Sequence, residues 1–395
     1  MSASPPLRPF RALLPSAVHF TPQQVLLRME SYYATLQQRS QDSPWGSMIL
    51  RFVQDAETYG AERATRQWLQ QGWFLADNRP HFYLHEHTFR LFGHEYTRRG
   101  LLALYRLGLD LLYPHENTFP EGIQFHLRLL ETTRKQFAPV MVIYPADAFQ
   151  LQDFDRLGPP VFEGEDEFGH GHRYWRVRVP EHRIQAVSLS EMVLADGHHR
   201  VEAAVAYAQT HGFPFLLIEL IPYGDPALFV LPTHRVVYGV DFAALKRRCR
   251  GCFDIFRLSE QEVNARTVLL QELRQALVLV LPEGTFLLRA RPELDPHMAH
   301  LPREFRRLPV YILHDFLLKE LAPRKTEYVR EVREVLRRVR HGGADAGFIL
   351  PALAPETVAR VAWNGLVLPQ KSTDFYPKLV AGPVILSLDP GMVGT

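Results

Sequence analysis

The chain has 395 residues, of which 46% are hydrophobic and 22% charged, a composition typical of folded soluble proteins and not of disordered ones. This length is more than one hydrophobic core usually needs, so two domains or one large elaborated domain are expected. The 45 basic and 43 acidic residues leave a net charge of +2, which argues against a general nucleic-acid or membrane binder.

The N-terminal segment and the cysteines indicate a cytoplasmic protein. The first residues include arginines and prolines where a signal peptide would need an apolar core. No apolar run approaches the roughly 18 residues of a membrane span. Cys249 and Cys252 have no second pair with which to form a four-cysteine zinc site, and two reduced thiols fit a reducing compartment.

Predicted strands and helices alternate along the chain. Strands are predicted where aromatic, β-branched or alternating apolar residues cluster, and these segments are 81–93, 139–145, 173–180, 214–222 and 229–240. Helices are predicted where apolar residues recur at helical spacing, and these segments are 20–40, 123–136, 243–250, 259–276 and 326–340. The segment 97–110 fits either state, and 163–172 is expected to be a polar loop.

Beyond about residue 240, helical patterns alternate with strand-like apolar runs. A Pro-Glu-Gly turn divides the apolar run over 276–292, which predicts a hairpin. Together with the first part of the chain, this alternation predicts an α/β or α+β architecture. We expect a phosphate-binding domain over residues 1–240 and a second α/β domain over residues 241–395.

The stretch VLADGHHRVEAAVAYA, which begins at Val193, predicts a strand, a tight turn and the start of a helix. Gly197 permits the turn, and apolar residues recur at helical spacing from Arg200 onward. Backbone N–H groups and the dipole at a helix N-terminus favour an anion. His198, His199 and Arg200 add donors, and an arginine can hold phosphate through two parallel hydrogen bonds. The pattern therefore predicts a phosphate site.

Asp196 in the same turn would repel a phosphate, so another role is expected for it. It can cap the helix, bind Mg²⁺ or act as a base. The alternative is that Asp196 only caps the helix and that the histidines pack locally, although two histidines and an arginine in one turn are costly for packing alone. Neither a Walker motif nor a complete G-x-G-x-x-G is present, so a nucleotide site here would be of another kind.

At this turn the sequence resembles a known family. ADGHHR, followed by Glu202 and Ala203, resembles the bacterial and archaeal family called domain of unknown function 1015. Other stretches that resemble this family, in chain order, are RPFRALLP, TRRGLLALYRL, PHENT, PVMVIYP, LPTHRVV and LPQKSTDFYPKLVAG. The family usually has a Pro-Pro-Tyr-Asp segment near its start, where this chain reads PSAVHFTPQQVL.

Around the DGHHR turn, that family is in turn similar to the superfamily of ParB, sulfiredoxin and free serine kinase. The resemblance implies a ParB/sulfiredoxin-like α/β core in which the strand, turn and helix hold the phosphates of ATP, ADP or CTP. It fixes no reaction, because the superfamily includes kinases, a reductase and a DNA-segregation switch.

Three further stretches carry candidate site residues. Glu116 in PHENT is a candidate general base for a substrate hydroxyl, although PHENT also fits a turn that bonds its own backbone. Thr233, His234 and Arg235 follow an apolar run, where strand ends often face a ligand, although an edge turn with a solvated arginine fits equally. The second domain is expected to contribute a loop rich in hydroxyls and amines to the cleft, with the candidates Lys371, Ser372, Thr373 and Lys378.

Two H-x-H pairs raise the question of a metal site. On a strand, His85 with His87 and His170 with His172 would each place both rings on one face, which is a workable half of a zinc site. No HExxH motif is present, and 18 histidines in the chain make some close pairs expected. Local packing is therefore the favoured interpretation.

Three hypotheses for the function follow. The first is a nucleotide-dependent phosphotransferase acting on a small, serine-like hydroxyl compound, with Asp196, His198 and Glu116 as catalytic candidates, Asp196 as the ligand of Mg²⁺, and ATP or ADP held by Gly197 and the other candidates. The second is a nucleotide-gated regulator that binds without phosphoryl transfer and acts on a protein partner, nucleic acid being disfavoured by the charge. The third is a metal-dependent hydrolase built on the histidine pairs.

Overall fold

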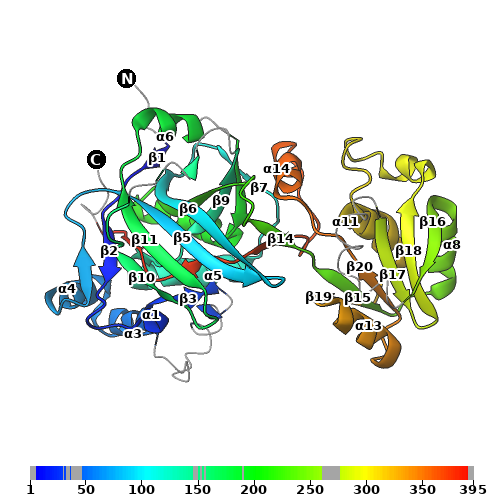
Figure 1. The fold of residues 1–395 in the computed structure, drawn as a ribbon, viewed down its shortest axis with the longest axis horizontal. Helices are drawn as coiled ribbons and strands as arrows, with labels where there is room; N and C mark the ends of the chain where they lie inside the picture. The colour runs from blue at the N-terminus through cyan, green and yellow to red at the C-terminus, as the bar shows by residue number, and fades with distance from the viewer. Residues whose placement is uncertain are drawn as a thin grey trace. The chain divides into compact units, whose positions relative to one another are not determined.

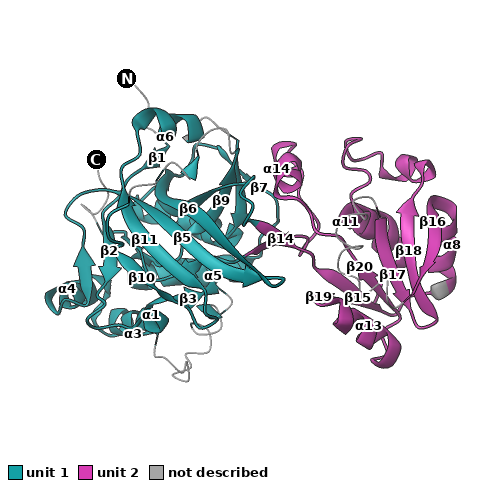
Figure 2. Cartoon of the chain, viewed as in Figure 1, with its two compact units in different colours: residues 1–228, 377–395 teal, residues 229–376 magenta. Residues whose placement is uncertain are grey.

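The computed structural model describes residues 6–29, 31–32, 36, 47–145, 150–151, 154, 157–188, 191–259 and 276–389. Helices and strands alternate along the chain (Figure 1), which confirms the predicted α/β class. The chain forms two compact units (Figure 2). The first unit comprises residues 1–228 and 377–395, and the second comprises residues 229–376.

This division differs from the boundary expected near residue 240, for two reasons. Strand β15 (His234–Tyr238) pairs with β19 (Lys325–Val329) and β20 (Ala346–Ile349), so it belongs to the second unit. Strand β23 (Ile385–Ser387) pairs with β2 (Ala12–Pro15), so the C-terminal segment returns to the first unit. Pairing between distant strands sets both boundaries, and local composition does not reveal such pairing.

A nine-stranded sheet among the described residues is the framework of the first unit. Its path runs β10, β11, β5, β6, β13, β9, β12 and β7, with β1 beside β6. Their bounds in that order are Phe162–Glu165, Gly171–Val177, Phe82–Leu91, His94–Arg106, Phe215–Pro222, Val140–Tyr144, Met192–Asp196, Leu112–Pro114 and Leu7–Arg8. Within this sheet β13 runs parallel to β9, and β12 runs parallel to β7. The four strands predicted in this part of the chain are confirmed, and the ambiguous segment 97–110 lies mostly in strand β6.

Helices cover both faces of this sheet. Helices α5 (Pro120–Thr133) and α7 (His198–His211) pack on the face to which Leu104 and Leu217 point. Neighbouring residues of β6 and β13 alternate between the two faces. The residues of β6 and β13 that point to the opposite face form a second core together with α6 (Glu181–Ser188). The helix predicted over residues 123–136 is confirmed as α5 up to Thr133, whereas residues 135–136 form a short strand that pairs with β23.

Smaller elements complete the first unit. Strands β4 (Phe74–Ala76), β2, β23 and β8 (Lys135–Gln136) form a four-stranded sheet, and β3 (Leu27–Arg28) pairs with β22 (Val380–Ala381). The helices of this part are α1 (Pro22–Val25), α3 (Met48–Tyr59) and α4 (Ala61–Gln70).

The helix predicted over residues 20–40 is only partly present. It begins as expected, with Pro22 in the first turn after the N-cap Thr21, whose N–H donates to Oε1 of Gln24 at 2.9 Å. Helix α1 then ends at Val25, and β3 follows at residues 27–28, so a continuous helix is wrong. The reason is a strand partner, β22, from the distant C-terminal segment. Parts of 30–40 lie outside the described residues.

The second unit contains a six-stranded sheet ordered β16, β18, β17, β20, β15 and β19. Strands β17 (Ala276–Leu281) and β18 (Gly284–Ala290) form the predicted hairpin, and β16 (Phe253–Leu258) pairs with β18. Strand β14 (Phe229–Leu231) pairs with β21 (Asp374–Tyr376). The other elements of this unit are α8 (Phe242–Cys252), η2 (Pro292–Met298), α11 (Pro309–Tyr311), η3 (Ile312–Leu318), α12 (Lys319–Leu321), α13 (Val332–His341) and α14 (Pro355–Trp363).

Helix predictions in the second unit have mixed outcomes. The helix predicted over 243–250 is confirmed as α8. The helix predicted over 326–340 is wrong in its first part, which is strand β19, and right in its second part, which is α13. Residues 325–329 form a strand because β15 offers them an antiparallel partner. The helix predicted over 259–276 falls almost entirely outside the described residues.

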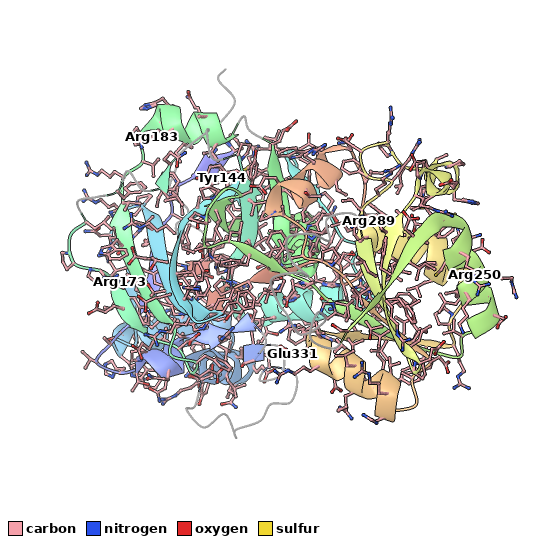
Figure 3. All side chains as sticks on the ribbon, turned by 45° about the vertical axis from the view of Figure 1, so that its right-hand side comes forward. Tyr144, Arg173, Arg183, Arg250, Arg289 and Glu331 are labelled. Atoms are coloured by element: carbon pink, nitrogen blue, oxygen red, sulfur yellow. The ribbon has the colours of Figure 1, made fainter. Side chains whose placement is uncertain are left out.

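Charged side chains project from both units. Arg173 on β11, Arg250 on α8 and Glu331 before α13 are exposed, whereas Tyr144 at the end of β9 is buried (Figure 3). Among the described residues, no helix combines the length and the apolar character needed to cross a membrane.

Candidate functional site

The predicted strand, turn and helix around DGHHR are present in the first unit. Strand β12 ends at Asp196, and Gly197 is the N-cap of α7 in the left-handed conformation, with φ of 102°. A Cβ at position 197 would lie 2.8 Å from Nη2 of Arg200, so the turn needs glycine both for its backbone angle and for space. Gly197 has no side chain with which to cap α7, and the helix ends at a left-handed Gly212. The N-terminus of α7 is therefore built as the sequence predicted.

Asp196 lies between two cations. Its Oδ2 accepts a hydrogen bond from Nη2 of Arg200 at 2.8 Å, and its Oδ1 accepts one from Nζ of Lys378 at 2.7 Å. The side chains of Asp196 and Lys378 remain 22% and 15% exposed. Burial by itself would raise the pKa of the Asp196 carboxyl, but Lys378 and Arg200 outweigh burial and hold that pKa well below its ordinary value. The three groups together carry one net positive charge.

The Arg200 guanidinium faces into the protein. It is 7% exposed, and besides Asp196 its Nη1 donates to the carbonyl oxygen of Pro139. Its Nε is buried without a hydrogen-bond partner. It lines a small cavity of about 30 Å³ together with His126 and Lys135, among others. Arg200 thus ties the start of α7 to the segment before β9, and a two-pronged grip on phosphate would require it to exchange these bonds.

The two histidines of the turn contact the segment that precedes α5. Nε2 of His198 lies 3.4 Å from the backbone nitrogen of His115, and Nε2 of His199 accepts a hydrogen bond from the N–H of Phe119 at 3.0 Å. Burial, together with the neighbouring His115, lowers the pKa of His198 to about 3, so its ring is neutral at neutral pH. Both histidines act as acceptors that position this segment.

The PHENT segment lies beside the DGHHR turn because β7 and β12 are parallel neighbours. Pro114 of β7 pairs with Leu194 of β12, and the carboxyl ends of parallel strands meet at one edge of a sheet. Nδ1 of His115 donates to the carbonyl oxygen of Leu194 at 2.6 Å. The half-buried Glu116 follows directly, so the structure places it at the same sheet edge as Asp196.

Most of the other predicted residues belong to the second unit, where they gather around the buried Arg235. Its guanidinium donates to the carbonyl oxygens of Gln370 at 3.0 Å and Lys371 at 3.1 Å, and its Nε donates to Nε2 of His314 at 3.2 Å. The hydroxyl of Ser372 donates to a carbonyl of the same loop. Arg235 therefore fixes the backbone of the loop that carries Lys371 and Ser372.

The residues around Arg235 also bind one another. The carbonyl oxygen of Thr233 accepts a hydrogen bond from Arg235, and Nδ1 of His234 accepts one from the N–H of Leu350 at 3.2 Å. Thr373 is half-buried in the same loop. Of the four candidates named from the C-terminal loop, Lys378 alone lies in the first unit, against Asp196.

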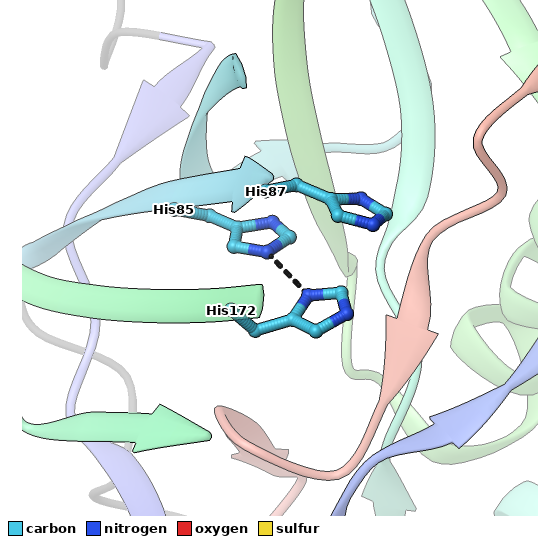
Figure 4. A group of neighbouring side chains, drawn as sticks. All are labelled: His85, His87 and His172. Carbon is cyan, nitrogen blue, oxygen red and sulfur yellow. Dashed lines mark hydrogen bonds between the residues drawn. The ribbon is translucent and has the colours of Figure 1, made fainter. Parts of the chain in front are cut away.

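The structure also assembles a histidine cluster for which the sequence favoured local packing. Strands β5 and β11 are antiparallel neighbours in which His172 pairs with His87. His85, His87 and His172 each offer a nitrogen, and these nitrogens all lie within 4.8 Å of one another (Figure 4). The H-x-H spacing was the available signal. The register between β5 and β11, which joins the two pairs, is not visible in the sequence.

A protein-family model described as "Protein of unknown function (DUF1015)" matches residues 51–311. This chain belongs to the DUF1015 family. The match confirms the resemblance found in the sequence, and it spans both the DGHHR turn and the PHENT segment of this family member. No curated protein matches the chain in sequence.

The solved structures that are similar over 71% of this DUF1015 chain include the following three. A conserved hypothetical protein from Pyrococcus furiosus is 14% identical, with 95% of that chain covered and a TM-score of 0.36. A free serine kinase in complex with AMP is 16% identical, with 91% covered and a TM-score of 0.37. SbnI with a C-terminal truncation, from Staphylococcus aureus, is 12% identical, with 87% covered and a TM-score of 0.40. At such low scores these similarities assign no function to the family.

Proposed function

We propose that this protein binds the phosphate groups of a nucleotide at the N-terminus of α7 and transfers a phosphoryl group to a small hydroxyl compound. The observation that carries the proposal is the net positive group formed by Asp196, Arg200 and Lys378 at the start of a 14-residue helix whose N-cap, Gly197, has no side chain to cap it. A helix N-terminus and a nearby lysine both favour a bound phosphate.

The proposed roles follow from the positions of the side chains. Lys378 neutralises charge on the transferred phosphoryl group, and Asp196 holds that lysine in place. Glu116 takes the proton of the acceptor hydroxyl while the hydroxyl oxygen attacks the terminal phosphorus of ATP or ADP. The bond from phosphorus to the bridging oxygen breaks, and the shortened nucleotide leaves. His198 and His199 are positioning residues for the PHENT segment.

Magnesium does not fit as a direct ligand of Asp196 in this arrangement. Mg²⁺ binds carboxylate oxygens, and both oxygens of Asp196 are engaged, one by Arg200 and the other by Lys378. The proposal therefore gives the neutralising role to Lys378, and no step runs through Mg²⁺.

Replacing the proposed base tests the reaction. Glu116→Gln should leave the Kd for ATP within about threefold of the wild type, because the amide keeps the size of the side chain, and should lower phosphoryl transfer by about 10²-fold or more. Calorimetry gives the Kd for ATP. The formation of the shortened nucleotide in the presence of a panel of hydroxyl compounds gives the rate of phosphoryl transfer. Glu121→Gln, at an exposed position of α5, is the control. Normal turnover in Glu116→Gln would remove Glu116 from the mechanism.

If the protein binds a nucleotide but transfers no phosphoryl group, the same site would instead serve the second candidate function, that of a nucleotide-gated regulator. Either function fits a cytoplasmic location, because the only two cysteines of the sequence, both in α8, are unpaired.

A further inference from the structure

We propose that His85, His87 and His172 bind a divalent transition-metal ion, of the class to which Zn²⁺ belongs. The three rings come from neighbouring strands, β5 and β11 (Figure 4). His172 pairs with His87, and Tyr174 pairs with His85, so all these side chains share one face of the sheet. Each of the three histidines is 1% exposed. This site is independent of the function proposed for the DGHHR turn.

Neutral rings alone leave an electrostatic conflict in this cluster. Nδ1 of His85 lies 2.9 Å from Oε1 of Glu219, so this nitrogen donates to the carboxylate, and Nε2 of His85 keeps a lone pair. Nδ1 of His172 lies 3.0 Å from that Nε2 and must then carry the proton between them. Nε2 of His172 is left with a lone pair that faces Oδ2 of Asp166 at 3.6 Å. Nε2 of His172 and Oδ2 of Asp166 are both buried without a hydrogen-bond partner. Buried acceptors without a partner lower the stability of the folded protein.

A metal ion between His85 and His172 removes the conflict. With Nε2 of His85 and Nδ1 of His172 as ligands, Nε2 of His172 carries a proton that it can donate to Asp166. The two ligand nitrogens are 3.0 Å apart, against about 3.3 Å in a tetrahedral site with zinc–nitrogen bonds of about 2.0–2.1 Å. Small ring rotations close that difference.

The second nitrogen of each ligand then has an acceptor, as in known metal sites. Glu219 holds His85, and Asp166 faces His172. Carboxylates in these positions orient histidine ligands and raise their basicity. His87 supplies the third nitrogen: its Nδ1 is buried without a partner, and its Nε2 lies 3.1 Å from Nδ1 of His170.

The sheet leaves space for the Glu219 carboxylate to reach His85. Glu219 is on β13, and His85 is on β5, with β6 between them. Gly100 of β6 pairs with His85, and a Cβ at this position would collide with the Glu219 carboxylate. The missing side chain at position 100 therefore lets Glu219 reach His85 across the intervening strand.

Two arginines limit which fourth ligand the ion can carry. Arg98 pairs with His87 across β5 and β6, is 1% exposed, and has Nε and Nη2 without partners. Arg28 approaches Asp166, with Nε 3.9 Å from Oδ2. These positive charges disfavour a bare cation, so the fourth ligand is expected to be an anionic oxygen, such as hydroxide or a carboxylate, to which Arg98 can donate.

Cobalt is the probe for the test, because four-coordinate Co²⁺ has intense visible bands and replaces Zn²⁺. Untagged full-length protein is stripped of metal and titrated with Co²⁺, both folded and during refolding, and Zn²⁺ then competes. We expect one ion per chain with a four-coordinate spectrum, and at least 100-fold weaker binding in His85→Gln and His172→Gln. His94→Gln, at an exposed position at the start of β6, should bind as the wild type does.

Glu219→Gln covers the case in which a ligand variant fails to fold, because it keeps all three ligands. It should bind Co²⁺ about 10- to 100-fold more weakly than the wild type, since it loses the carboxylate behind His85. Circular dichroism checks the fold of each variant. The proposal is overturned if the folded wild type takes up no stoichiometric Co²⁺, or if folded His172→Gln or Glu219→Gln binds with unchanged affinity.

Discussion

Gly197 connects backbone conformation and side-chain packing in one residue. Gly197→Ala should destabilise the protein, because alanine at φ of 102° is strained and its Cβ would lie 2.8 Å from Nη2 of Arg200. We expect a loss of about 2–3 kcal/mol in the free energy of unfolding, measured in urea. Gly212→Ala is the matched control, because Gly212 is also left-handed but a Cβ there meets nothing within 4 Å. It should cost about 1 kcal/mol. Equal losses would show that Arg200 does not constrain the turn.

The sequence identifies the residue types of this turn but not their partners. The ADGHHR motif predicts the strand, the turn and the helix start, because glycine and helical spacing are local signals. It does not predict that Arg200 bonds inward to Pro139, or that His199 accepts a hydrogen bond from Phe119. Those contacts depend on how β9 and α5 pack beside the turn, and sequence neighbours carry no information about that packing.

At the scale of elements, β15 and η3 of the second unit should make stability sensitive to acid. Nδ1 of His234 accepts a hydrogen bond from the N–H of Leu350, and Nε2 of His314 accepts one from Arg235. Protonation would abolish both bonds and add positive charge beside Arg235. Burial, followed by the charge of Arg235, lowers the pKa of each histidine to about 4.

The sign of the pH effect follows from the lowered pKa values. In the unfolded chain both histidines take up protons near pH about 6.5, whereas in the folded chain they stay neutral down to about 4. Their contribution to stability is therefore full above about pH 6.5 and falls as the pH drops towards 4, by up to about 1.4 kcal/mol per pH unit for each histidine. His314→Gln keeps an acceptor but cannot titrate, so its urea midpoint should fall less between pH about 7 and about 5 than that of the exposed control His341→Gln. Identical pH profiles would show that His314 does not make the stability sensitive to acid.

Local signals predicted elements well where a segment has one clear periodicity. Strands β5, β9 and β13 and helices α5 and α7 were all expected from their sequences. Prediction failed where a distant strand determines the local state, as at β3, which pairs with β22, and at β19, which pairs with β15. Helical spacing in such segments is overridden by strand pairing, because backbone hydrogen bonds to a partner strand outweigh a weak helix preference.

At the scale of the whole molecule, the return of the chain end to the first unit decides which candidates meet. Lys378 follows β21 of the second unit by two residues, yet it lies in the first unit and binds Asp196. Lys371, seven residues earlier, belongs to the second unit. The density of hydroxyls and amines made both lysines candidates, but the sequence could not assign them to different units. The division between the units depends on strand pairs far apart in the chain.

If Lys378 helps to hold a nucleotide at the DGHHR turn, nucleotides should stabilise the wild type against heat but not Lys378→Met. A ligand that binds only the folded state raises Tm, by the equivalent of about 2.7 kcal/mol at 100 times its Kd. ATP, ADP, CTP or GTP should raise the Tm of the wild type, and the rise should be lost in Lys378→Met. It should persist in Lys319→Met, which removes an exposed lysine of the second unit. If no nucleotide raises the Tm of the wild type, or if Lys378→Met keeps the full rise, the DGHHR turn with Lys378 is not a nucleotide site.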